Sequence, residues 1–122
     1  MSIWCLIVDL KHVKFFLNNK LRLLQSAGPS YVVTQCPLAC TFFDFWTMVW
    51  EQQIEIVVCL LSDNEMGKGC IYWPSDKSNP LAVGDWLVAL QSINVKQHSV
   101  ERILTLTKHV IILRNDKKIY FY

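Results

Sequence analysis

The middle of the chain begins with a short apolar run and continues with a segment of helical periodicity. Residues 31–35 are mostly β-branched or aromatic, and Pro37 ends the run, which predicts a short strand. In the next segment Thr41 and Asp44 have the spacing of a capping box, so we predict a helix that begins there. Apolar side chains at three- and four-residue spacing favour core packing of one helix face over an exposed binding stripe. The predicted buried face consists of Phe42, Phe45, Trp46, Val49 and Trp50.

The second half of the chain is patterned as strands. Residues 54–61 form a nearly continuous apolar run, which is typical of a strand covered on both faces. Strand, helix and second strand predict a βαβ unit with parallel strands. Further strands with short connections predict an antiparallel meander, with a hairpin turn at 114–117. The predicted meander strands are Val83–Ile93, Val100–Thr107, His109–Arg114 and Lys118–Tyr122. The fold class is therefore α/β: a mixed sheet with a parallel βαβ unit followed by an antiparallel meander.

The first 30 residues are patterned less clearly. The apolar run 3–8 fits a buried strand or a first helical turn better than a targeting segment, because no basic residue precedes it and Asp9 ends it. Apolar residues over 13–24 recur at helical spacing and predict an amphipathic helix, while 25–30 has the composition of a loop. The positions that carry the helical spacing are Val13, Phe16, Leu17, Leu21 and Leu24.

Composition narrows the functional classes. Of the 122 residues, 52% are apolar and 18% charged, so the chain either has a very full core or lacks a surface that would cover it. A net charge of +2 with scattered cations predicts no nucleic-acid partner. No apolar run approaches the roughly 20 residues of a membrane span.

Cysteine and histidine spacing predicts no metal site and no cofactor. Cys36 and Cys40 are separated by a segment that contains Pro37, which is not the spacing of a zinc site, and the three His residues are isolated from one another in the sequence. Five cysteines without a secretory signal fit a reducing cytosolic compartment.

Three stretches, taken in order, resemble the classical protein tyrosine phosphatases. Residues 31–38 (YVVTQCPL) are similar to the pattern Y-I-A-T-Q-G-P-L, with Cys36 in place of Gly, and residues 44–51 match D-F-W-x-M-V-W-E at every fixed position. Residues 72–74 match the Y-W-P that follows the next strand. We expect the motif residues to be structural: Thr34, Gln35, Pro37, Thr41, Asp44, Phe45, Trp46, Trp50, Tyr72, Trp73 and Pro74.

The resemblance implies a partial phosphatase domain over residues 31–122, preceded by a segment of uncertain origin at 1–30. The wording of 62–66 (SDNEM) and 99–106 (SVERILTL) is most similar to the cytosolic His-domain phosphatases that carry a Bro1 domain. Those proteins work in endosomal sorting, so the resemblance implies a cytoplasmic protein associated with endosomes.

The parts of the family that perform chemistry have no counterpart in this sequence. The K-N-R-Y recognition loop should lie upstream, and residues 1–30 contain nothing like it. The cysteine of H-C-x-x-G-x-x-R, the Asp of the W-P-D loop and the Gln that positions water would all lie beyond Tyr122. The complete domain would hydrolyse phosphotyrosine proteins, and the chain alone is expected to be inactive. The alternative is a non-catalytic, pseudophosphatase-like module that binds a protein.

Glu65 and Lys68 are the candidate site residues. Lys68 lies four residues before Tyr72, where the family keeps a Lys on its E-loop, and Glu65 aligns with the Glu that pairs with the phosphate-binding Arg. In a complete domain they would orient the phosphate cradle and the acid loop. A solvated polar loop explains the same residues equally well.

Overall fold

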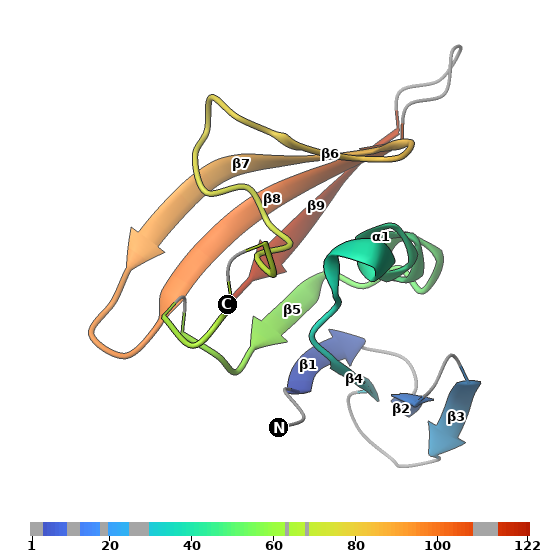
Figure 1. Cartoon of the computed structure of the whole chain (residues 1–122). Helices are drawn as coiled ribbons and strands as arrows, with labels where there is room; N and C mark the ends of the chain where they lie inside the picture. The colour runs from blue at the N-terminus through green and yellow to red at the C-terminus, as the bar shows by residue number, and fades with distance from the viewer. Residues whose placement is uncertain are drawn as a thin grey trace.

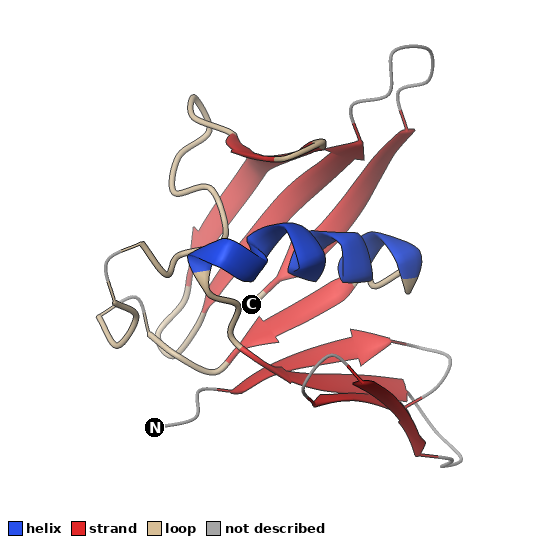
Figure 2. Ribbon diagram, turned by 45° about the vertical axis from the view of Figure 1, so that its right-hand side comes forward, coloured by secondary structure: helices blue, strands red, loops and turns tan. Residues whose placement is uncertain are grey.

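The protein is described by a computed structural model, which covers residues 4–9, 13–17, 20–24, 30–62, 64–67, 69–108 and 115–122. These residues form a nine-stranded mixed sheet in the order β3-β2-β4-β1-β5-β9-β8-β7-β6 (Figure 1). One helix lies along one face of this sheet (Figure 2). The elements are β1 (Trp4–Asp9), β2 (Val13–Leu17), β3 (Lys20–Leu24), β4 (Ser30–Gln35), η1 (Ala39–Thr41), α1 (Phe42–Glu51), β5 (Ile56–Cys59), β6 (Leu81–Val83), β7 (Trp86–Val95), β8 (Val100–Lys108) and β9 (Asn115–Phe121).

The predicted helix is confirmed as α1, and its predicted apolar face lies against the core. Phe42, Phe45, Trp46 and Val49 are buried, while Trp50 is half-buried and packs on the core from its edge. The capping box was wrong. The Thr41 hydroxyl accepts a hydrogen bond from Leu38 N at 2.9 Å and donates one to Leu38 O at 3.1 Å, so it closes the short helix η1 instead of capping α1.

The helix connects two strands that run in the same direction, as predicted, but these strands are not neighbours. β1 lies between β4 and β5 and is antiparallel to both. At one end of β1, Cys5 stands opposite Thr34 of β4 and opposite Cys59 of β5. The crossover therefore spans one strand, and a segment from the start of the chain fills the space it leaves.

The amphipathic helix predicted over 13–24 was wrong, because this segment forms the antiparallel hairpin of β2 and β3. The apolar residues of this segment fit both the helical period of 3.6 and the strand period of 2. Over Lys20–Leu23, for example, charged and apolar side chains alternate as they do in a strand. Of the two readings given for residues 3–8, the strand is confirmed by β1. The loop predicted over 25–30 falls on residues 25–29, which lie outside the described residues, and on Ser30, which begins β4.

The antiparallel meander is confirmed in β6 to β9, with two corrections. The single strand predicted over 83–93 is divided by a turn at Gly84 and Asp85, where Gly84 has a φ of 55°. The turn predicted at 114–117 was also wrong, since Asn115 already belongs to β9 and stands opposite Lys108. The strand predicted over 109–114 lies outside the described residues.

The last strand joins the two halves of the sheet. β9 pairs in parallel with β5, with Ile56 opposite Tyr120, and extends the ladder at its end where Cys59 N donates to Tyr122 O at 2.7 Å. The parallel pairs of the sheet are therefore β5–β9 and β2–β4, whereas β4 and β5 run in the same direction without being paired.

Candidate functional site

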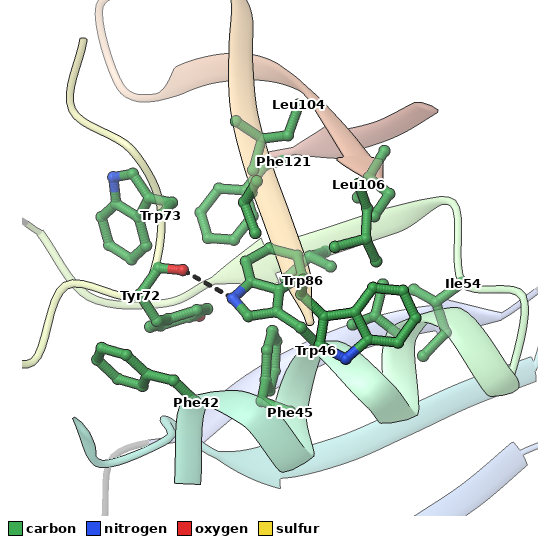
Figure 3. Close-up of a cluster of buried hydrophobic side chains, with 14 of the residues drawn as sticks. Phe42, Phe45, Trp46, Ile54, Tyr72, Trp73, Trp86, Leu104, Leu106 and Phe121 are labelled. Atoms are coloured by element: carbon green, nitrogen blue, oxygen red, sulfur yellow. Dashed lines mark hydrogen bonds between the residues drawn. The ribbon is translucent and has the colours of Figure 1, made fainter. Parts of the chain in front are cut away.

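The residues that match the phosphatase motifs contact one another at the centre of the core. Trp46 of α1 is 0% exposed, and its indole Nε1–H donates to the Tyr72 carbonyl at 3.0 Å (Figure 3). The Phe45 ring meets the Tyr72 ring edge-on, with centroids 4.8 Å apart. A buried indole needs a hydrogen-bond acceptor, and the backbone of the Y-W-P segment supplies it. These residues hold the loop after β5 in place. Because they are buried, they are not placed to take part in chemistry themselves.

Trp73, the next residue of the same motif, packs the loop against the meander strands. The Trp73 ring lies 4.9 Å from the Phe121 ring of β9 and 5.3 Å from the Arg102 guanidinium of β8, measured to centroids. Arg102 is buried, and a desolvated guanidinium over an indole is a favourable cation–π contact. Pro74, which follows Trp73 in the chain, is also buried. Nothing in the sequence indicates that Arg102 is buried, since one Arg among alternating strand residues gives no signal of burial.

Trp50 and Trp86 hold the other end of the helix to the sheet. Their ring centroids are 5.1 Å apart, and the Trp86 indole donates to the Thr47 hydroxyl at 2.8 Å. In the first motif, Thr34 and Gln35 end β4, and Pro37 is buried in the turn toward α1. Asp44 is exposed in the first helical turn, where a carboxylate interacts favourably with the helix dipole.

Glu65 lies in an exposed loop and uses its carboxylate within that loop. Its Oε2 accepts from Ser62 N at 2.9 Å and from the Ser62 hydroxyl at 3.0 Å. These two hydrogen bonds lower the pKa of Glu65, so the group is a carboxylate at neutral pH. Met66, the next residue, is buried and anchors the loop. Lys68 lies outside the described residues, so its position relative to Glu65 stays a prediction.

Two half-buried thiols lie beside this loop. Cys59 ends β5. The interaction with Cys36, which follows β4, together with burial raises the pKa of the Cys59 thiol well above its ordinary value. The Leu61 carbonyl lies 3.8 Å from Cys59 Sγ. Cys59 is therefore a protonated thiol at neutral pH and unsuited to act as a nucleophile. The substitution of Cys36 for Gly in the first motif was the sequence signal for this pair.

Metal chemistry has no support in the described part of the chain. No group of three or more His, Cys, Asp or Glu residues there could hold an ion. Nor does any described helix have the length and apolar character needed to cross a membrane.

Comparison with known proteins gives these motifs their context. The family model for protein-tyrosine phosphatase matches residues 8–119. The chain belongs to the protein-tyrosine phosphatase family. Mouse (Mus musculus) tyrosine-protein phosphatase non-receptor type 23 is 42% identical over 80 residues, which is 64% of this chain and 5% of that protein. The human (Homo sapiens) protein of the same name is 40% identical over 80 residues, again 64% and 5% of the two chains. Rat (Rattus norvegicus) tyrosine-protein phosphatase non-receptor type 20 is 35% identical over 80 residues, 64% of this chain and 19% of that protein.

The chain thus spans about 5% of the length of the type 23 phosphatases that it matches. Its 122 residues contain no H-C-x-x-G-x-x-R sequence, the motif that carries the phosphatase nucleophile and phosphate cradle. What it does contain is the structural framework of a tyrosine phosphatase domain: the helix, the strand that follows it, the Y-W-P turn and the meander. The sequence prediction of a tyrosine phosphatase fragment is confirmed at this level.

Proposed function

We propose that this chain supplies the non-catalytic framework of a phosphotyrosine hydrolase and has no hydrolase activity by itself. The observation that carries the proposal is that the matched residues Trp46, Tyr72 and Trp73 are buried in aromatic packing. The raised pKa of Cys59, which lies outside the matched motifs, adds that this thiol keeps its proton at neutral pH. A complete domain would hydrolyse phosphotyrosine proteins through a cysteinyl-phosphate intermediate, for which it needs a thiolate and a cluster of anion-binding donors. Removing the nucleophile of such a unit removes nearly all of the rate enhancement.

An assay with p-nitrophenyl phosphate tests this directly. We expect the purified chain to turn over no faster than buffer, and the chain extended through the downstream reading frame to gain activity if H-C-x-x-G-x-x-R follows. The Cys59→Ser variant is the control for this cysteine, because turnover that persists in it does not come from Cys59. Turnover that is present in the wild-type chain and lost in this variant would contradict the proposal.

In a complete domain, we propose that Glu65 and Lys68 position the phosphate-binding Arg. Support comes from the ionised carboxylate, held in place by Ser62. In the extended, active chain, Glu65→Gln should lower kcat with little change in KM, because its effect reaches the substrate through the Arg. Asp76→Asn is the matched control, since Asp76 is also an exposed carboxylate with a lowered pKa, held by Ser78. Equal effects of the two variants would leave Glu65 as a solvated loop residue.

A binding module is the second candidate, and exposed apolar side chains favour it. Leu38 is 61% exposed and Leu60 is 63% exposed, and each lies just beyond a strand of the βαβ unit. For this candidate we propose a protein partner and no nucleic acid. We also propose a cytoplasmic, endosome-associated location, which rests on the resemblance to the His-domain phosphatases. Co-fractionation of the tagged chain with endosomal markers tests the location; a uniform distribution would contradict it.

A further inference from the structure

The outer edge of β7 is open over its second half. β6 pairs with β7 as far as Val88, and beyond this residue β7 has β8 on one side and no described strand on the other (Figure 1). A register shift between Leu90 and Ser92 interrupts the ladder with β8, and regular pairing continues over 92–95. Segment 92–95 is therefore a short, regular strand edge that is available to another strand.

The backbone groups that point outward on this edge belong to Ile93 and Val95. Lys96 N donates to Ser99 O at 2.8 Å, so these two residues form a hydrogen-bonded pair at the end of the β7–β8 hairpin. Because hydrogen-bonded and non-hydrogen-bonded pairs alternate in an antiparallel ladder, Val95 and Ile93 direct their N–H and C=O groups away from β8. Their side chains share one face of the sheet and are 73% and 46% exposed. The edge is therefore apolar as well as unpaired.

We propose that this edge pairs antiparallel with the same edge of a second copy of the chain, about a twofold axis at Asn94. In this register Ile93 of each copy stands opposite Val95 of the other, and the two residues exchange their outward backbone hydrogen bonds. Their apolar side chains lie next to each other across the new ladder. Asn94 is exposed and stands opposite the Asn94 of the second copy. The proposal goes beyond the framework function, because this surface lies outside the phosphatase motifs.

The distribution of charge favours a second copy as the partner of β7. β7 contains no charged residue, so two β7 edges meet without repulsion. The nearest cation, Lys96, would stand opposite Ser92 of the second copy, and it is already paired with Glu101 in its own chain. β3, at the other edge of the sheet, carries Lys20 and Arg22, and charges of this kind protect an edge strand against pairing. Self-pairing is therefore expected at β7 and not at β3.

The neighbouring registers are less favourable. A twofold axis at Val95 would place Ile93 opposite Gln97, which lies beyond the end of β7. An axis at Ile93 would place Val95 opposite Gln91, at the register shift. Only the axis at Asn94 pairs both apolar residues with each other. Because the paired segment is short, the contact is smaller than a standard protein interface, and we expect a dimer that dissociates on dilution.

A cysteine cross-link tests both the pairing and its register. Residues opposite each other in a non-hydrogen-bonded antiparallel pair have Cα atoms roughly 4.5 Å apart, which a disulfide can span. Asn94→Cys in the full chain should therefore form a disulfide between two copies on mild oxidation, and mass spectrometry of the linked peptides identifies position 94 on both sides. Gln91→Cys is the matched control, because Gln91 is also exposed on β7 but would lie roughly 20 Å from its counterpart.

The outcomes of the cross-link separate a defined pairing from random association. We expect linkage through position 94 and little through position 91. Equal linkage at the two positions, links through the native cysteines alone, or no link between copies would overturn the proposal.

Sedimentation velocity over a range of concentrations measures the dimer without a cross-link. Ile93→Pro removes an outward N–H and no hydrogen bond to β8, so it should weaken dimerisation by at least about tenfold. Ala82→Pro is the control, since Ala82 lies on β6, outside the proposed contact, and this variant should dimerise as the wild type does. Circular dichroism compares the folds. A wild-type monomer at every concentration, or association that Ile93→Pro leaves unchanged, would overturn the proposal, and the cross-link decides it if Ile93→Pro does not fold.

Discussion

At the scale of single residues, Gly84 shows how closely the helix and the meander approach each other. Its φ of 55° favours glycine, and a Cβ at this position would lie 2.6 Å from Phe43 Cδ2. Gly69 has a φ of 77°, but a Cβ at Gly69 would have no atom within 4 Å. Both glycines therefore have a left-handed backbone conformation, but only at Gly84 would a side chain also collide with Phe43.

We predict that Gly84→Ala is more destabilising than Gly69→Ala. Each should lose about 1–2 kcal/mol from the left-handed backbone conformation, and Gly84→Ala should lose more because Phe43 has to move. Urea unfolding of the two variants measures the difference. Adding Phe43→Ala to each is the control: it should bring the two losses together, and losses that stay different would show that Phe43 is not the cause.

A second prediction concerns the pH dependence of Glu65. Its pKa lies below the ordinary value of 4.5 because Ser62 donates two hydrogen bonds to the carboxylate. A lowered folded pKa means that this group stabilises the folded state above its unfolded pKa, and the stabilisation is lost as pH falls through the folded pKa. An NMR titration of the Glu65 carboxyl should show a midpoint below 4.5. Ser62→Ala removes the hydroxyl and keeps the backbone N–H, so it should raise that midpoint in part, and Ser99→Ala should not. Equal midpoints in all three proteins would contradict a contribution from the hydroxyl.

At the scale of secondary-structure elements, β1 carries the central pairing. Ile7 stands opposite Val32 on one side and Val57 on the other. Ala82 of β6 has a neighbour only on β7, among the described strands. The turn at Gly84 and Asp85 makes Val83 the hydrogen-bonded residue, so the next residue outward, Ala82, falls in a non-hydrogen-bonded pair.

We predict that Ile7→Pro abolishes folding, while Ala82→Pro is tolerated. Proline in a central strand removes a ladder hydrogen bond and costs roughly 3 kcal/mol or more, whereas an edge position with an outward N–H loses little. Limited proteolysis of the two variants compares them directly. Similar resistance of both variants to protease would show that β1 is not a central strand.

The sequence predicted the elements whose signals are local. The α1 face follows from its helical periodicity, and the β7–β8 pairing follows from the short connection between the two strands. The direct β8–β9 pairing was not predicted, because a separate strand was expected over 109–114. The insertion of β1 was beyond this reasoning, because nothing near residues 4–9 indicates a partner at 56–59. The hairpin at 13–24 was missed for another reason: two periodicities fit it, and only the edge of β4 selects the strand.

At the scale of the whole molecule, a filled core coexists with an uncovered surface. Trp46, Val57 and Leu104 are completely buried. Several large apolar side chains are nevertheless exposed, and the outer edge of β7 has a partner strand only beside Trp86 to Val88 among the described residues. The exposed side chains are Leu38, Phe43, Leu60, Ile93, Val95, Tyr120 and Tyr122. An open, uncharged strand edge of this kind favours association with other chains.

We predict poor solubility, or a loosely packed state that binds a hydrophobic dye strongly. At about 25 cal/mol per Å², a few hundred Å² of uncovered apolar surface forgoes several kcal/mol, comparable with the stability of a small domain. Thermal unfolding with dye fluorescence measures this. Ile93→Lys should reduce aggregation, and the matched Lys96→Ile should increase it. A soluble monomer with little dye binding and one sharp transition above roughly 50 °C would contradict the prediction and favour the self-contained binding module.

The place of β1 between two strands that α1 connects also constrains how fast the sheet is completed. The β1–β5 pair joins Ile7 with Val57, and the β5–β9 pair joins Ile56 with Tyr120. Each of these ladders must close a long loop before it gains any hydrogen bond, and two-state proteins dominated by such distant pairings fold in milliseconds to seconds rather than microseconds. The hairpins β2–β3 and β7–β8 need no such closure, so we expect them to form first. Until β1 and β9 have paired with β5, both edges of this apolar strand are unpaired and can associate with other chains.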